Sequence, residues 1–180
     1  MRSMNKMKLT KSIPMQSSKN LTVLGIDPGT TRIGFGVVEK EGSSFRVRAS
    51  GIFEHPQNPR RFEDEFLSLL ATHAPHAAAI EKIFFTKNQK TALAVTEMRG
   101  VMKFLIQKAD IPVLEFNPLE VKQYITGYGK AEKRQLEAMV MRILNIPTKA
   151  RHDDESDAIA IALCGALAYP MYTKTRNILS

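Results

Sequence analysis

Residues 21–30, LTVLGIDPGT, place an acid directly after a run of residues suited to a buried strand. A carboxylate among apolar side chains is costly to bury without a partner. The proline that follows cannot continue a hydrogen-bonded ladder, and the next glycine permits a sharp turn. The segment therefore predicts a strand over 21–27 that presents the carboxylate of Asp27 at its carboxyl end.

Alternating and helical apolar patterns divide the rest of the chain into short elements. A Gly- and Ser-containing connection favours a hairpin between the second and third strands. We expect strands over 21–27, 33–40, 44–53, 76–85 and 111–117, and helices over 58–75, 90–110, 118–125, 131–146 and 153–169. The pattern predicts an α/β fold with one five-stranded mixed sheet flanked by helices. The apolar stripe of helix 90–110 is wider than one sheet-facing side requires, so part of it either meets a second subunit or belongs entirely to the core.

Two further segments place acids at the edges of apolar elements. AAAIEKIFF inserts Glu81 into an otherwise apolar strand, and RHDDESDAIAIAL opens an apolar helix with Asp154 and Asp157. The last two are three residues apart and share one helix face. Each acid alone has a structural explanation, as a partner of turn amides or as a helix cap.

Carboxylates gathered in one cleft repel each other and raise one another's pKa unless a cation intervenes. A hard divalent ion such as Mg²⁺ takes oxygen ligands of this kind. Two such ions about 4 Å apart can activate a water and stabilise the leaving oxygen of a phosphodiester. The acids therefore point to nuclease or phosphoryl-transfer chemistry.

The charge distribution separates a tail from the globular part. The chain has 180 residues and a net charge of +8, and residues 1–20 contain five Lys and Arg and no acid. We predict a disordered basic N-terminal tail over 1–20, one domain over 21–170 and a C-terminal tail over 171–180. The tail is interpreted as an upstream start or a DNA-grazing arm, with an organelle transit peptide as the alternative. The single cysteine, Cys164, excludes an internal disulfide and fits a reducing cytoplasm.

Four motifs occur in the order found in the RuvC family of Holliday-junction resolvases, which the chain resembles over about residues 21–168. They are GIDPGTTRIGFGVV, AIEKIFFTKNQKTALAVTEMRGV, VKQYITGYGKAEKRQ and DDESDAIAIA. The resemblance implies a ribonuclease-H-like fold, a homodimer and Mg²⁺-dependent nicking of two opposed strands at a four-way DNA junction, in recombination and DNA repair. It also implies two Mg²⁺ per subunit, with Mn²⁺ as a substitute, and a branch-migration helicase complex of RuvA and RuvB as partner.

The resemblance assigns roles to individual residues. The family's catalytic and metal-binding carboxylates fall on Asp27, Glu81, Asp154 and Asp157, with Asp153 as the alternative to Asp154. Its junction-wedging aromatic falls on Phe84. The residues expected to contact DNA are Phe84, Lys87, Lys122, Lys130, Lys133 and Arg134. His152 is a candidate for contact with a phosphate or a water, against the simpler reading of an exposed loop residue.

Three other functions are compatible with parts of the sequence. A ribonuclease-H-like nuclease that processes RNA shares the acids, and only the Phe84 and lysine-loop matches favour DNA junctions. An actin-like ATP-binding protein shares the GIDPGT turn but needs a second comparable domain, for which 180 residues are too few. A non-catalytic junction-binding protein would not need the acids.

Overall fold

The computed structural model of the chain describes residues 20–82, 89–147 and 151–179. The predicted basic tail, apart from Asn20, and the predicted DNA contacts Phe84 and Lys87 lie outside these ranges. The described elements are β1 Asn20–Asp27, β2 Ile33–Glu41, β3 Ser44–Phe53, α1 Pro59–His73, β4 Ala77–Glu81, α2 Gln89–Lys108, β5 Val113–Phe116, α3 Pro118–Thr126, α4 Lys133–Leu144 and α5 Asp153–Leu179.

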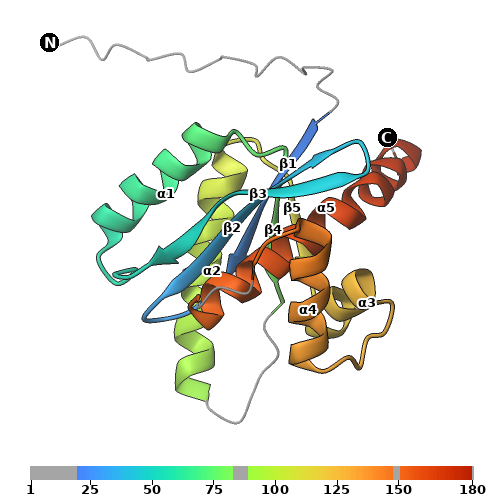
Figure 1. Cartoon of the computed structure of the whole chain (residues 1–180). Coiled ribbons are helices and arrows are strands. Elements are labelled where there is room, and N and C mark those ends of the chain that lie inside the picture. Colours follow the sequence, from blue (N-terminus) through green and yellow to red (C-terminus); the bar gives the residue numbers. More distant parts are fainter. Residues whose placement is uncertain (1–19, 83–88, 148–150, 180) are drawn as a thin grey trace, which may run out of the picture.

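The five strands form one mixed sheet in the order β3-β2-β1-β4-β5 (Figure 1). β1, β2 and β3 are antiparallel neighbours, whereas β4 runs parallel to both β1 and β5. The predicted five-stranded mixed sheet is therefore confirmed. Because β1 and β4 are parallel neighbours, their carboxyl ends meet at the same edge of the sheet.

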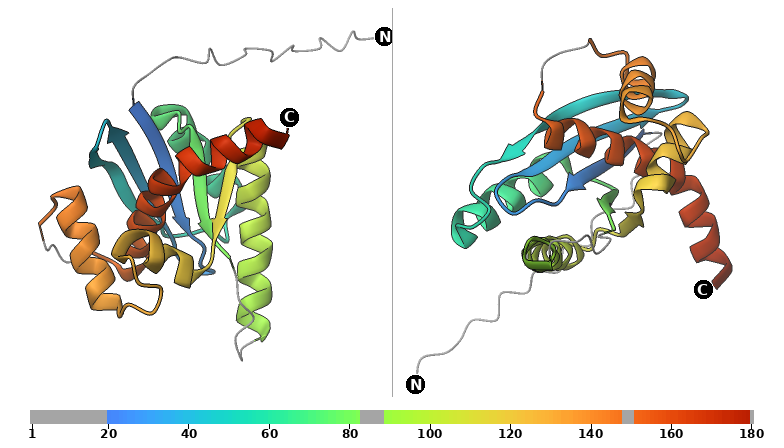
Figure 2. Two further views of the ribbon diagram at one scale, coloured as in Figure 1. Left: turned by 90° about the vertical axis from the view of Figure 1, so that its right-hand side faces the viewer. Right: turned by 90° about the horizontal axis from the view of Figure 1, so that it is seen from below.

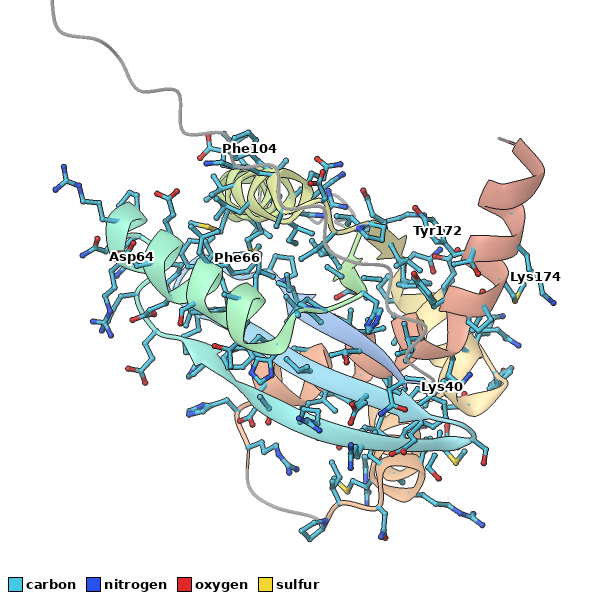
Figure 3. All side chains as sticks on the ribbon, turned by 90° about the horizontal axis from the view of Figure 1, so that it is seen from above. Lys40, Asp64, Phe66, Phe104, Tyr172 and Lys174 are labelled. Atoms are coloured by element: carbon cyan, nitrogen blue, oxygen red, sulfur yellow. The ribbon has the colours of Figure 1, made fainter. Side chains whose placement is uncertain are left out.

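Helices cover both faces of the sheet (Figure 2). α1 and α2 cover one face, where Phe62, Phe66 and Leu70 of α1 pack with Met102 and Ile106 of α2 against the apolar residues of the strands. Figure 3 shows the ring of Phe66 beneath α1 and that of Phe104 on the outer side of α2. Across the described residues, no helix combines the length and apolar character needed to cross a bilayer.

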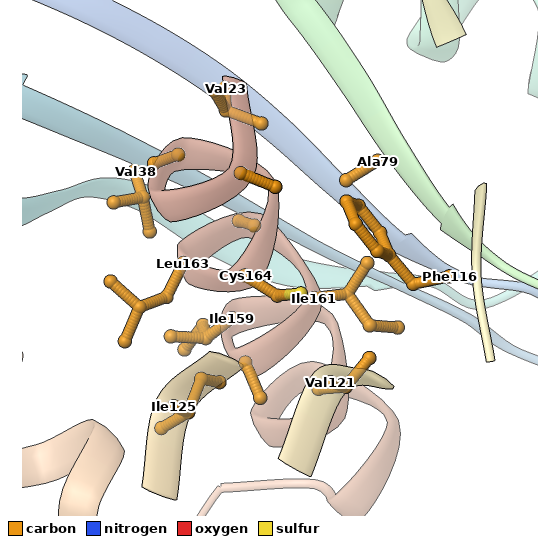
Figure 4. Close-up of a cluster of buried hydrophobic side chains, with 14 of the residues drawn as sticks. Val23, Val38, Ala79, Phe116, Val121, Ile125, Ile159, Ile161, Leu163 and Cys164 are labelled. Atoms are coloured by element: carbon orange, nitrogen blue, oxygen red, sulfur yellow. The ribbon is translucent and has the colours of Figure 1, made fainter. Parts of the chain in front are cut away.

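α5 lies on the opposite face and contributes more buried residues to the second core than any other element (Figure 4). Ile159, Ile161 and Leu163 are each at most 2% exposed, and α3 and α4 close over them with residues such as Val121 and Val140. Between residues 158 and 168 every remaining residue except Leu167 is Ala, Cys or Gly, so the helix backbone lies close to the strands. Packing on this face of the sheet therefore also positions the two ends of α5.

Two helix boundaries illustrate how the sequence sets them. α3 begins at Pro118 after a capping box in which the amide of Glu120 donates to Asn117 Oδ1 (2.8 Å) and Glu120 Oε2 accepts from the amide of Asn117 (2.6 Å). α5, by contrast, was expected to end at residue 169 and continues to Leu179 with Pro170 inside it. No Gly or further Pro follows Pro170 to end the helix, so the expected C-terminal tail begins inside α5.

Candidate active site

Asp27 and Glu81 leave neighbouring parallel strands at the same edge of the sheet. Ile26 of β1 pairs with Ile80 of β4, so each acid is the next residue along its strand. Gly25 pairs with Ala79, and Gly165 of α5 comes close to the Cβ of Ala79, so this pair faces α5. Side chains two residues apart on a strand share a face. Both carboxylates therefore project from the carboxyl ends of β1 and β4 toward the α5 side.

Three glycines let α5 approach this corner of the sheet. A Cβ built at Gly34, which pairs with Asp27, would lie 1.8 Å from the backbone oxygen of Asp154. A Cβ at Gly25 would lie 2.2 Å from the oxygen of Ala158, and one at Gly36 would lie 2.8 Å from the Cα of Ile159. Any side chain at these positions would push the first turns of α5 away from β1 and β2. The glycines thus place the Asp154 and Asp157 segment beside Asp27.

The pKa shifts show that the four carboxylates share one electrostatic environment. Burial, followed by the charges of Asp157, Glu81 and Asp154, raises the pKa of Asp27 from 3.8 to about 7. Burial and then the charge of Asp157 raise the pKa of Glu81. Burial also raises the pKa of Asp157, against the lowering effect of Lys133. The structure therefore brings together the acids that the sequence places on three separate segments.

Two cations of the chain lie against this carboxylate group. Lys133 Nζ, at the start of α4, is 3.3 Å from Asp157 Oδ2 and 3.7 Å from Asp153 Oδ2. Partial burial acts to lower the pKa of Lys133, but the charges of Asp157 and Asp153 raise it overall, which keeps the ammonium charged. Arg32 Nε lies 3.2 Å from Asp154 Oδ2. Negative charge at this corner is thus partly balanced by Lys133 and Arg32.

The structure distinguishes Asp154 from its neighbours. Asp154 adds to the pKa shift of Asp27, whereas Asp153, with a side chain 87% exposed, acts on Asp157 and Lys133. His152 is exposed, and its Nδ1 lies 3.4 Å from Arg32 Nη1. The placement therefore favours Asp154 as the member of the group.

Sequence reasoning missed three supports of the site. Arg32 follows Asp27 by five residues in the quoted turn motif, a signal that was available. Arg99 of α2 donates from Nε to the backbone oxygen of Glu81 (3.1 Å) and also binds the carboxylate of Glu115 on β5. Ser50 Oγ donates to Glu155 Oε1 (2.7 Å), which fixes the first turn of α5 to β3. The last two link distant elements, and no sequence pattern indicates them.

The candidate ligands are carboxylate oxygens, with no sulfur among them. Ligands of this type suit a hard divalent cation. Within the ranges that the structure describes, no three His, Cys, Asp or Glu side chains are already arranged as a ligand set. The group is drawn together by α5 and the strand ends, while Lys133 and Arg32 each hold one of its members. Repelling, partly buried carboxylates of this kind are the setting in which Mg²⁺ binds.

The predicted basic residues lie on the α3–α4 side of the molecule. Lys122 is half-buried on α3, Lys130 is exposed in the α3–α4 connection, and Arg134 is exposed in the first turn of α4. Lys133, between them and the acids, is the one for which a contact with the carboxylate group is observed. Lys122, Lys130 and Arg134 therefore lie on α3, α4 or the loop that joins them.

Comparison with known proteins decides the family. The family model of the crossover junction endodeoxyribonuclease RuvC matches residues 23–165, which include all four carboxylates. The chain belongs to the RuvC family. A RuvC from Roseiflexus sp. is 43% identical over 154 residues, covering 82% of this chain and 92% of that protein. A Rubrobacter xylanophilus RuvC is 40% identical over 165 residues, covering 88% and 92% respectively.

Solved structures agree with this assignment. The Thermus thermophilus RuvC structure superimposes with a TM-score of 0.76 at 33% identity, covering 85% of this chain and 98% of that chain. T. thermophilus RuvC in complex with a Holliday junction substrate gives a TM-score of 0.77 at the same identity, covering 85% and 97%. The yeast mitochondrial resolvase Ydc2, at 16% identity and a TM-score of 0.63, shares the fold, with 88% of this chain and 82% of that chain covered. The resemblance and the ribonuclease-H-like fold predicted from the motifs are thus confirmed, and this RuvC-family protein is an endodeoxyribonuclease.

Proposed function

We propose that this RuvC-family protein resolves four-way DNA junctions by hydrolysing one phosphodiester bond in each of two opposed strands. The observation that carries the proposal is the meeting of Asp27, Glu81, Asp154 and Asp157 at the carboxyl ends of β1 and β4. The Holliday junction bound to T. thermophilus RuvC supports the choice of substrate. The catalytic roles of the four acids are part of this proposal.

The cofactor in this proposal is Mg²⁺, two ions per subunit, with Mn²⁺ as a substitute. When bound, the metal supplies an activated water and stabilises the charge that develops on the leaving oxygen. Asp27, Glu81, Asp154 and Asp157 would hold the metal. Burial at the strand ends and packing of α5 over Gly34 limit the motion of the backbone that carries them, so a metal would need only small side-chain movements to gather its ligands.

Lys133 is proposed to act on the phosphate rather than on the metal. Its ammonium already lies beside Asp157, and its raised pKa keeps it protonated at neutral pH. A fixed positive charge at this position stabilises negative charge on the phosphate oxygens as the bond breaks. Lys122, Lys130 and Arg134 are proposed to bind backbone phosphates further along the strand, and Phe84 and Lys87 to contact the junction itself, as the resemblance implies.

A second copy of this chain is proposed to pack on the outer face of α2. Leu93 and Phe104 are each 62% exposed and Val101 is 47% exposed, although α2 also has a fully buried face at Met102 and Ile106. The three exposed side chains lie eight and three residues apart, so they line one stripe of the helix. A two-fold dimer through this stripe carries two active sites, as paired cuts in two opposed strands require.

The remaining partners belong to the same proposal. A branch-migration complex of RuvA and RuvB is inferred from the family resemblance. The cytoplasm is inferred as the compartment because the single cysteine, Cys164, is free and fully buried in the α5 core, where burial raises the pKa of its thiol to about 12. A thiol of this kind is inert packing rather than a redox group.

The decisive experiment uses a synthetic four-way DNA junction with Mg²⁺, the wild-type protein and Asp27→Asn. We expect wild type to produce symmetric nicks in two opposed strands and Asp27→Asn to bind the junction without cutting it. An RNA four-way junction and a linear DNA duplex serve as controls. Equal cutting by both proteins would remove Asp27 from the mechanism, and preferential cutting of the RNA would replace the proposed substrate.

A further inference from the structure

The connection between α3 and α4 presents an aromatic ring to solvent. Tyr128 is 60% exposed and lies between two glycines, Gly127 and Gly129. A single exposed tyrosine is ordinary on a protein surface. The hydrogen bonds around it are what single out this residue.

The backbone on both sides of the ring is pinned by side chains of α3. Gln123 Nε2 donates to the backbone oxygen of Gly127 (2.9 Å), and Gln123 Oε1 accepts from the amide of Gly129 (3.0 Å). The amide of Tyr128 donates to Thr126 Oγ1 (3.1 Å). One amide side chain thus bridges the two glycines that flank Tyr128, and a second side chain holds the tyrosine backbone between them.

This conformation requires a glycine at position 127 and leaves little room for a side chain at position 129. Gly127 has φ +76°, in the left-handed region, and a Cβ at Gly129 would lie 3.2 Å from the backbone oxygen of Leu119. The loop therefore holds its shape before any ligand arrives. A tyrosine side chain has only two rotatable bonds, so a ring on a fixed backbone loses little conformational entropy on binding.

The loop lies on the same side of the molecule as the carboxylate group. It leads directly into Lys133, whose ammonium contacts Asp157. Figures 1 and 2 place the α3–α4 connection at the same end of the molecule as the carboxyl end of β4. Lys122 and Lys130, on either side of the ring in sequence, form no ion pair with any residue inside the described ranges.

A rigid exposed ring among uncompensated cations has the chemistry of a single-stranded nucleic-acid contact. We propose that Tyr128 stacks on a base of the cleaved DNA strand, next to the phosphate held at the carboxylate group, while the neighbouring lysines bind the flanking phosphates. This inference rests on the proposed function. It assigns to Tyr128 a part in holding the strand and in choosing the sequence that is cut.

The test compares Tyr128→Ala and Tyr128→Phe with the wild-type protein on four-way junctions whose cleavable positions carry all base combinations. Loss of a base–aromatic stack predicts a fall of about 5- to 100-fold in kcat/KM for Tyr128→Ala and a changed distribution of cut sites. Tyr128→Phe keeps the ring and is expected to cut within about threefold of wild type at the same sites. The matched control is Leu119→Ala, because Leu119 is 59% exposed on α3 and its side chain has no role in the loop contacts.

A second measurement reports stacking without cleavage. The protein contains no tryptophan, so a junction with 2-aminopurine beside the cleavage position can be read by fluorescence when bound to Asp27→Asn. We expect binding to quench the probe, and the additional Tyr128→Ala change to remove that quenching. Unchanged quenching together with unchanged cut sites in Tyr128→Ala would overturn the inference while wild-type cleavage upholds the proposed function. Failure of the wild type to cut any junction would instead reject the proposed function.

Discussion

Asp27→Asn should stabilise the metal-free protein while abolishing its activity. Burial and three neighbouring carboxylates hold the pKa of Asp27 at about 7 instead of 3.8, so folding disfavours the charged form. Asparagine keeps the size and one oxygen of the side chain and removes the charge. The variant thus isolates the free-energy cost of the carboxylate in the folded state.

The magnitude and the sign follow from linkage. Because the folded-state pKa is the higher one, this acid costs no stability below about pH 4, and the cost grows until the pH passes about 7. A shift of about three pKa units corresponds to about 4 kcal/mol at pH 8. We expect Asp27→Asn to gain about 2–4 kcal/mol over wild type at pH 8, relative to their difference at pH 4. In a domain of this size such a gain raises Tm by about 5–15 °C.

Urea unfolding followed by circular dichroism in EDTA at pH 4, 6 and 8 measures this difference. Glu39→Gln is the control of opposite sign. Glu39 is 8% exposed at the other end of the sheet, and although burial acts to raise the pKa of its carboxyl, Arg46 and Arg48 lower it overall. That variant should lose stability at neutral pH, and its deficit should shrink as the pH falls through the folded-state pKa. A difference between Asp27→Asn and wild type that does not change with pH would refute the reasoning, as would a less stable variant at pH 8.

Two further variants test the scaffold of the site and the dimer. Gly34→Ala should cost about 1–3 kcal/mol and at least tenfold in junction cleavage, because its Cβ would meet the backbone oxygen of Asp154, whereas Ser68→Ala, exposed on α1, should cost nothing in urea unfolding or cleavage. Normal cleavage by Gly34→Ala would show that α5 does not need this close approach. Phe104→Glu should convert a dimer to a monomer in analytical ultracentrifugation, with Leu67→Glu on α1, which is 38% exposed, as the control. A dimeric Phe104→Glu would place the subunit contact elsewhere.

The order and type of the elements could be predicted from the sequence because each carries a local signal. The residues of β1 and β2 are either alternately or continuously apolar, and both strands end at turns. α3 begins at Pro118, directly after a capping asparagine. Boundaries depended on the same signals. The helix from Asp153 was predicted to end at residue 169, where the apolar pattern fades, and this was too early because no Gly or Pro after Pro170 stops the helix before Leu179.

The candidate acids could be found in the sequence, but their convergence could not. Asp27 and Glu81 become neighbours only because β4 pairs in parallel with β1, a contact across 54 residues. Asp154 reaches them because Gly34 has no side chain, and a glycine in a strand gives no indication of which helix will cross it. Arg99 was invisible for a similar reason, since its partner is the backbone oxygen of Glu81, which any residue type would supply.

The helix that brings charge to the site also supplies the packing that offsets it. Burial of the Asp27 carboxylate, together with the charges of its three acidic neighbours, costs about 4 kcal/mol at pH 8, by the linkage argument. Ile159, Ile161 and Leu163 on the same helix are at most 2% exposed, and burial of each contributes about 1.5–3 kcal/mol. Their sum exceeds this cost, so α5 stays docked with its acids held together. A cation that then binds the acids relieves the electrostatic cost that folding has already imposed on them, and the end of a buried helix holds such acids in place better than a flexible loop would.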